Sequence, residues 1–208
     1  MIENGQKEVP KMPLRSLDVD EKRSRFGFFG QINKFKGLGV LLRAIHEMDE
    51  ETRSQIRLEV NGTNLDKQPE PFQEEIRSLS DDLIDEGTVV WKGSYKPNEL
   101  QARMREVDWV CVPSIWWENS PMVIQEALSF GRPLLVSNIG GMTEKVLDEE
   151  TGLHVPVASW SAWKDAMIRA MSSPQLCETF WQNIVQPLSY EDCADRHLDV
   201  FHQWESVS

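Results

Sequence analysis

Two glutamates, Glu118 and Glu126, stand eight positions apart in the stretch WWENSPMVIQEALSFG, residues 116–131. Between them, Ser120 is a favourable N-cap residue and Pro121 a favourable first residue of a helix, so a helix is predicted to begin between the two carboxylates. Glu118 is then expected on the loop before the helix. Glu126 is expected about 9 Å along the helix axis, from the rise of 1.5 Å per residue.

The start of this helix is suited to a phosphate group. Proline has no N–H, so the first free backbone amides are those of Met122 and Val123, and together with the helix dipole they suit a phosphate or diphosphate. A carboxylate displaced from the diphosphate can accept hydrogen bonds from neutral hydroxyls. Nucleotide-sugars carry hydroxyls on both sides of a diphosphate, so two carboxylates flanking a helix start match this ligand class. Ser120, at the predicted cap, is assigned to the same binding group.

A second candidate loop is GQINKFKGLG, residues 30–39. Lys36 can reach phosphates as a point charge, and Gly37 lets the backbone approach a neighbour closely. Gly30 and Gln31, at the start of the loop, are assigned to the same binding group as Ser120. The spacing matches neither the G-x-G-x-x-G fingerprint nor a P-loop.

A third candidate loop is NIGGMTEKV, residues 138–146. Its double glycine, Gly140 and Gly141, directly follows a predicted strand. The pair again indicates that backbone passes close to another group at this point.

Short apolar runs alternate with helical patterns around these loops. Strands are predicted at 26–29, 56–60, 88–92, 108–114, 133–137 and 153–157. Helices are predicted at 38–48, 71–87, 97–107, 121–131, 142–150, 159–172, 174–186 and 190–205. Wholly apolar strands that alternate with helices indicate an α/β fold, a Rossmann-like, doubly wound parallel sheet of about six strands with helices on both faces. Such sheets bind ligands at the carboxyl ends of their strands, where the three loops are expected.

Residues 1–24 are polar, contain two prolines and lack apolar periodicity, so they are interpreted as a linker or tail before a domain at 25–208. The 22 Lys and Arg against 34 Asp and Glu give a net charge of −12, which argues against nucleic-acid binding and against docking on anionic lipid by charge. Three widely spaced cysteines, the lack of a signal core and the lack of a membrane-length apolar run predict a cytoplasmic location without a transmembrane segment.

The stretch PSIWWENSPMVIQEALSFGRPLLVSNIGGMTEKVLDEETGLHVP, residues 113–156, resembles the signature region of the family-4 glycosyltransferases of the GT-B fold. That family has a Glu, seven residues, Glu arrangement, which Glu118 and Glu126 match. GQINKFKG, residues 30–37, is similar to the family's glycine-arginine and lysine-glycine loop. The resemblance extends over the strand–helix order from about residue 25 to the end of the chain.

The resemblance implies a role for each candidate. Glu126 would bind the ribose hydroxyls and Glu118 would face the donor sugar. Lys36 and the amides of Met122 and Val123 would hold the diphosphate and stabilise the charge of the leaving nucleoside diphosphate. The donor would be a UDP-, GDP- or ADP-sugar, transferred with retention and without a metal or other cofactor to an acceptor in surface polysaccharide or glycolipid synthesis. Base choice in this fold is often made by backbone in loops such as GSY, residues 93–95.

Two departures from the family pattern keep alternatives open. Gln31 stands where the family often has arginine, and Ser120-Pro121 stands where it often has Phe-Gly. Because Gln31 brings no charge, a non-catalytic binding or regulatory module remains an alternative. A nucleotide-sugar epimerase of the same fold is another, although it would need catalytic acids and a histidine in a different arrangement.

GT-B enzymes have two Rossmann-like domains with the active site between them, and this chain resembles only the second, donor-binding half. MIENGQKEVP, residues 1–10, resembles the linker between the halves. The expected partners are therefore the nucleotide-sugar and an N-terminal GT-B domain, and the isolated chain is expected to bind donor weakly and to transfer nothing. Peripheral membrane association of the whole enzyme is compatible with this interpretation.

Two further patterns are interpreted without a ligand. Asp18-Val19-Asp20 spells the D-x-D metal motif of the other glycosyltransferase fold, but it lies in the polar segment and is interpreted as accidental, so no metal site is predicted. Of Trp116 and Trp117, one is expected to pack in the core and the other to lie at the domain cleft or on the acceptor side.

Overall fold

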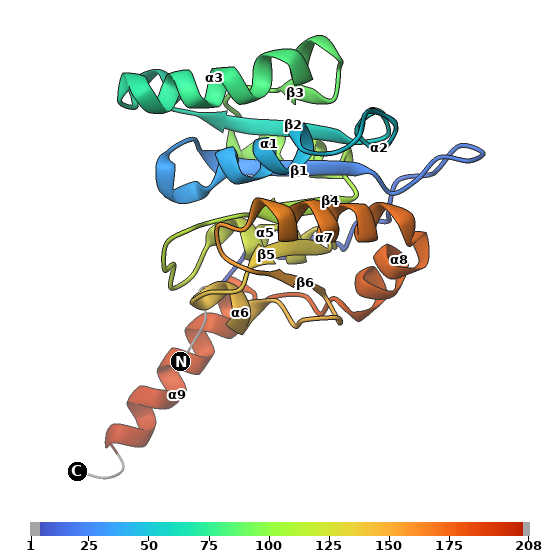
Figure 1. The fold of residues 1–208 in the computed structure, drawn as a ribbon. Helices are drawn as coiled ribbons and strands as arrows, with labels where there is room; N and C mark the ends of the chain where they lie inside the picture. Colours follow the sequence, from blue (N-terminus) through green and yellow to red (C-terminus); the bar gives the residue numbers. More distant parts are fainter. Residues whose placement is uncertain (1–4, 206–208) are drawn as a thin grey trace.

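One six-stranded sheet organises the chain (Figure 1). The computed structural model describes residues 5–205. The strands are β1 (Arg25–Gln31), β2 (Arg57–Thr63), β3 (Val89–Trp91), β4 (Trp109–Val112), β5 (Leu134–Ser137) and β6 (Gly152–Val155). Their order in the sheet is β3-β2-β1-β4-β5-β6, and every neighbouring pair is parallel. This order reverses between β1 and β4 and confirms the predicted doubly wound, Rossmann-like fold.

Each predicted helix is present, with shifts of a few residues at its ends. The α-helices are α1 (Leu38–His46), α2 (Glu50–Ser54), α3 (Glu70–Asp85), α4 (Pro97–Arg105), α5 (Met122–Ser129), α6 (Gly141–Lys145), α7 (Trp160–Ser172), α8 (Pro174–Asn183) and α9 (Tyr190–Glu205). Two 3₁₀ turns, η1 (Lys34–Lys36) and η2 (Leu65–Lys67), complete the set of described helical elements. The sequence did not predict α2 or the 3₁₀ turns, because segments of five residues or fewer are too short to show helical periodicity.

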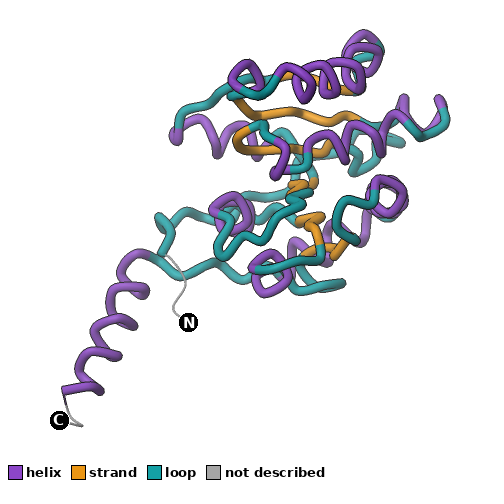
Figure 2. The backbone as a smooth tube through the Cα atoms, turned by 60° about the vertical axis from the view of Figure 1, so that its left-hand side comes forward, coloured by secondary structure: helices purple, strands orange, loops and turns teal. Residues whose placement is uncertain are grey.

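Both faces of the sheet are covered, as alternation along β4 illustrates. Trp109 and Cys111 point into one hydrophobic cluster, and Val110 and Val112 point into the other. The first cluster includes side chains of α1, α3, α7 and α8, and the second includes side chains of α4, α5 and α6. Figure 2 shows helices on both sides of the strands. Strands buried on both faces are rich in apolar residues, which is why these strands were readable from the sequence, although β2 also buries Glu59 and Asn61.

Residues 5–24 contain no helix or strand, but they pack against the domain and do not form a free tail. Met12 is buried, and the buried guanidinium of Arg132 donates hydrogen bonds to the carbonyl oxygens of Met12, at 3.2 Å, and Pro13, at 2.5 Å. The boundary at residue 24 stays a prediction, and residues 1–4 and 206–208 lie outside the described part of the chain.

The last helix, α9, points away from the body of the molecule (Figure 1). It carries apolar side chains with high exposed fractions, among them Leu198 at 51% and Phe201 at 64%. Tyr190, at its first residue, is 64% exposed. A helix with unburied apolar side chains has a surface suited to a further protein element.

Candidate functional site

Lys36 and Glu118 meet where the strand order of the sheet reverses. Lys36 ends η1, which follows β1, and Glu118 lies on the loop after β4. The Lys36 Nζ donates to Glu118 Oε2 at 2.7 Å, although the residues are 82 positions apart in the chain. The Ser114 hydroxyl donates to the other oxygen of the same carboxylate. The fold therefore brings together the two residues that the sequence analysis assigned to catalysis.

The lysine loop is shaped by its own residues and by β4. The Asn33 side chain caps η1 by accepting hydrogen bonds from the N–H groups of Phe35, at 3.0 Å, and Lys36, at 3.1 Å. Gly37 has a φ of +71°, and a Cβ there would lie 1.9 Å from the carbonyl oxygen of Pro113. The predicted close approach at Gly37 is therefore present, and its partner is the end of β4.

The double glycine of the third loop braces the Glu118 loop. The Gly141 N–H donates to the carbonyl oxygen of Glu118 at 2.8 Å. A Cβ on Gly141 would lie 2.1 Å from the carbonyl oxygen of Asn119, and one on Gly140 would lie 3.1 Å from the Trp117 ring. The close approach predicted for this pair is thus an approach of backbone to backbone within the chain, and it fixes the position of Glu118.

The start of α5 differs by one residue from the prediction. Pro121 is the N-cap, with φ −62° and ψ 112°, and its carbonyl oxygen accepts from the Ile124 N–H at 3.0 Å. Ser120 does not cap the helix, and its hydroxyl instead accepts from the Gln125 side chain at 3.1 Å. Proline fixes φ but leaves ψ free, so it can take the extended cap conformation as readily as the first helical position.

The first amides of α5 remain available, as predicted. In the part of the chain that the structure describes, the N–H groups of Met122 and Val123 have no hydrogen-bond partner. Both belong to the helix end that carries partial positive charge. An anionic group at this position would satisfy both donors.

Glu126 lies in the second turn of α5, partly buried. Its carboxylate has no hydrogen bond or ion pair with any residue that the structure describes, and burial raises its pKa above the ordinary 4.5. A partly buried charge without a partner is unfavourable, and hydroxyl donors from a ligand would relieve that cost. The chemistry that Glu126 offers is therefore acceptance of hydrogen bonds.

A cavity of about 270 Å³ opens at the carboxyl ends of β1, β2 and β3. It is lined by Gly30, Gln31, Gly62, Thr63, Ser94 and Tyr95. Gly30 has a φ of +138°, and a Cβ there would meet no atom within 4 Å. The sequence analysis proposed Gly30 and Gln31 but missed Thr63, because one polar residue at the end of a strand has no distinctive pattern.

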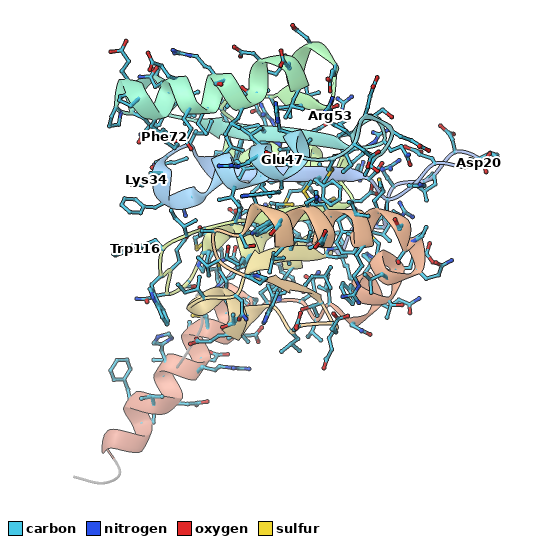
Figure 3. All side chains as sticks on the ribbon, in the orientation of Figure 1. Asp20, Lys34, Glu47, Arg53, Phe72 and Trp116 are labelled. Atoms are coloured by element: carbon cyan, nitrogen blue, oxygen red, sulfur yellow. The ribbon has the colours of Figure 1, made fainter. Side chains whose placement is uncertain are left out.

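Aromatic side chains border the same edge of the sheet. Trp116 and Trp117 are 60% and 68% exposed, and Trp116 makes an edge-to-face contact with the exposed ring of Phe35 at 5.4 Å. The expectation that one of the two tryptophans packs in the core is wrong, because both lie on the loop beyond the end of β4. In Figure 3, Trp116 and Lys34 lie at one edge of the molecule and Asp20 at the opposite edge. Asp18-Val19-Asp20 is therefore remote from the candidate site.

Among the described residues, no group of three or more His, Cys, Asp or Glu side chains could hold a metal ion. The absence of a metal requirement stays a prediction. No described helix has the length and apolar character that crossing a membrane requires.

Beyond the geometry of the site, the chain as a whole is similar to a known protein family. The family model described as "Glycosyl transferases group 1" matches residues 14–186. The chain belongs to this family. The match confirms the glycosyltransferase family expected from the sequence, and it begins inside the segment that was interpreted as a linker.

Several proteins to which the chain is similar are longer than it is. It is 30% identical over 166 residues to a D-inositol 3-phosphate glycosyltransferase of Corynebacterium aurimucosum, covering 78% of this chain and 38% of that protein. It superposes with a TM-score of 0.80 on sucrose-phosphate synthase from Thermosynechococcus elongatus, at 23% identity, covering 100% of this chain and 53% of that one. The TM-score is 0.71 with Anabaena HepE in complex with UDP and glucose, at 18% identity, covering 86% of this chain and 48% of that one. The chain thus spans about half or less of the length of each of these three proteins.

Proposed function

We propose that this chain is the donor-binding half of a retaining glycosyltransferase that moves a sugar from a nucleoside-diphosphate sugar to an acceptor. The observation that carries the proposal is the pairing of Lys36 with Glu118 at the topological switch point, beside the free amides that begin α5. The complex of HepE with UDP and glucose supports UDP as the first donor nucleotide to test.

The proposed chemistry is electrostatic. The amides of Met122 and Val123 and the ammonium of Lys36 would hold the diphosphate and stabilise the charge that grows on it as the sugar leaves. Glu126 would accept hydrogen bonds from the ribose. Glu118 is neutralised by Lys36 without donor, and when the diphosphate takes over the lysine, its carboxylate would be free to accept from the sugar hydroxyls.

The rest of the proposed enzyme is an N-terminal domain that closes over this edge of the sheet. The exposed apolar side chains of α9 and the exposed rings of Phe35, Trp116 and Trp117 provide surface for that domain and for the acceptor. Transfer without metal, an acceptor in surface polysaccharide or glycolipid synthesis, a cytoplasmic location and peripheral membrane association belong to the same proposal. The 208-residue chain alone is expected to bind donor without transferring sugar.

Calorimetric titration of the 208-residue chain with UDP, GDP and ADP tests the proposal. One nucleotide is expected to bind, and Glu126→Ala is expected to weaken it by roughly 10- to 100-fold, from hydrogen bonds to a charged group. Glu74→Ala, which alters an exposed glutamate on α3, is the matched control and should leave the affinity unchanged. Failure of this chain and of a longer, two-domain protein to bind any nucleotide would refute the proposal.

A binding module without transferase activity is the second candidate. Gln31 favours it, because this neutral residue lies at the end of β1 and lines the cavity where the family often has a cation. Sugar transfer by a two-domain protein that retains Gln31 would exclude this alternative. An epimerase is not favoured by any contact at the site.

A further inference from the structure

A single arginine holds the loop that follows β3. Arg103, on α4, donates hydrogen bonds from Nη1 to the carbonyl oxygens of Lys92, at 3.0 Å, and Gly93, at 3.2 Å, and from Nη2 to that of Ser94, at 2.8 Å. Its guanidinium also lies 5.5 Å from the centre of the Tyr95 ring. Four consecutive residues of this loop are therefore organised by one side chain.

The same guanidinium is anchored to the sheet. Arg103 Nη1 donates to the Oδ1 of Asn61 at 3.0 Å, and Asn61 is fully buried in β2, where its Nδ2 donates to the carbonyl oxygen of Glu59 at 3.3 Å. The fixed fork of a guanidinium can serve several acceptors at once, whereas an ammonium is a point charge on a flexible stem. The position of the loop relative to the sheet thus depends on arginine at this position.

The orientation of the carbonyls determines the orientation of the amides. In a planar trans peptide the N–H points opposite to the C=O of the same unit. The three carbonyls that face Arg103 therefore turn the N–H groups of Gly93, Ser94 and Tyr95 away from it. In the described part of the chain these three N–H groups have no backbone partner. Consecutive free amides of this kind can donate hydrogen bonds to an oxygen acceptor of a ligand.

Two of these three residues, Ser94 and Tyr95, belong to the wall of the cavity at the ends of β1 to β3. They line it together with Gly30 and Gly62. The Tyr95 ring is fixed on its other side by an edge-to-face contact with Phe29 at 6.0 Å. Burial and then the negative charge of Glu126 raise the pKa of Tyr95, so the Tyr95 side chain lies within electrostatic range of the proposed ribose carboxylate.

We propose that Arg103 is a positioning residue that aims the amides of Gly93, Ser94 and Tyr95 at a carbonyl oxygen of the nucleotide base. The inference rests on the proposed donor-binding function. It assigns the site a preference for bases with an exocyclic carbonyl, uracil and guanine, over adenine, whose exocyclic group is an amino donor. Arg103 does not touch the nucleotide itself and acts through the backbone that it holds.

Nucleotide discrimination is the readout that separates this role from a merely structural one. The 208-residue chain and its Arg103→Ala and Arg103→Lys variants are titrated with UDP, GDP, ADP and inorganic pyrophosphate. The unaltered chain is expected to bind UDP or GDP at least about tenfold more tightly than ADP, because a site built around hydrogen bonds rejects a ligand that lacks the matching group. Arg103→Ala should reduce that ratio to about threefold or less while leaving pyrophosphate affinity unchanged.

Two controls keep the test decisive. Arg105→Ala removes an exposed arginine from the same helix and should preserve the ratio. If Arg103→Ala does not fold, Arg103→Lys carries the test, because its ammonium retains the charge but cannot hold three carbonyls, and its ratio should fall as well.

Failure of the Arg103 role and failure of the donor site would give different results. Equal weakening of all three nucleotides, or an unchanged ratio in both Arg103 variants, would overturn the positioning role and leave the donor site standing. A chain that binds neither nucleotides nor pyrophosphate would overturn the donor site and this inference with it.

Discussion

The two edges of the sheet differ in how their buried or partly buried carboxylates are paired. At the amino-terminal edge, Asp108 is fully buried directly before β4, and its carboxylate accepts from Arg15 at 2.9 Å, from Arg23 at 3.3 Å and from the Arg25 N–H at 3.1 Å. At the carboxyl-terminal edge, Glu126 is partly buried and has no described partner. Since buried polar groups are normally paired, the contrast separates an edge built for stability from the edge that carries the proposed donor site.

Arginine side chains make the stabilising contacts at the amino-terminal edge. Arg132, fully buried beside β5, holds the carbonyl oxygens of Met12 and Pro13, and burial lowers its pKa to about 10. It therefore remains charged at neutral pH. Together with the Asp108 cluster, it attaches the segment before β1 to the domain.

The largest expected change in the free energy of unfolding comes from a substitution at the amino-terminal edge. Asp108→Ala leaves the guanidinium groups of Arg15 and Arg23 without their buried carboxylate, so the free energy of unfolding should fall by about 3–5 kcal/mol. Urea unfolding followed by tryptophan fluorescence measures it. A loss below about 1 kcal/mol, the size of an exposed ion pair, would contradict the stabilising role of this cluster.

Glu126→Gln should lower nucleotide affinity without lowering the free energy of unfolding. The folded-state pKa of Glu126 is raised, so this group favours folding most below its ordinary 4.5 and loses that contribution as pH rises through the folded value. At pH 7 the glutamine variant should therefore be as stable as the unaltered chain or more stable, while nucleotide affinity falls. Unfolding curves at several pH values between 4 and 8 test this prediction, and a clear loss of stability at pH 7 would show that Glu126 has a structural partner after all.

Lys36→Ala tests the pair at the switch point. The Lys36–Glu118 ion pair is partly exposed, with side-chain exposures of 33% and 19%, so its loss should cost only about 1 kcal/mol of stability. Pyrophosphate affinity should fall further, by roughly tenfold, because a charge-assisted contact to the diphosphate is lost. Lys34→Ala, which removes an exposed lysine from the same turn, serves as the control. Equal pyrophosphate affinity in both variants would remove Lys36 from the site.

The smallest change in the free energy of unfolding is expected for an exposed ion pair away from both edges. Arg169 and Glu149 form a two-point contact at 2.5 and 2.6 Å, but their side chains are 50% and 53% exposed. Arg169→Gln should change the free energy of unfolding by about 0–1 kcal/mol, and high salt should erase the difference. A larger, salt-independent loss would mean that exposure is a poor guide to the contribution of ion pairs in this chain.

The sheet was predictable because its strands are buried on both faces and are therefore mostly apolar. The Glu118 and Lys36 pair was predictable because parallel strands end at one edge and because the motif resembles a family. The packing of residues 5–24 was not, since Arg23 finds its carboxylate 85 positions away and nothing local announces it. Arg103 was missed for the same reason. Its partners are carbonyls and a strand residue, and a sequence does not display backbone contacts.

The bond from the Gly141 N–H to the Glu118 carbonyl has a consequence for protein engineering. Glu118 is held through its main chain as well as through its side-chain contacts with Lys36 and Ser114, so the exposed rings of Trp116 and Trp117 can be exchanged while these anchors remain. Gly37 and Gly141 tolerate no such exchange, because a Cβ at either would collide with neighbouring backbone. A library that randomises Trp116 and Trp117 and leaves Glu118 and both glycines untouched is therefore a rational route to new acceptors on this scaffold.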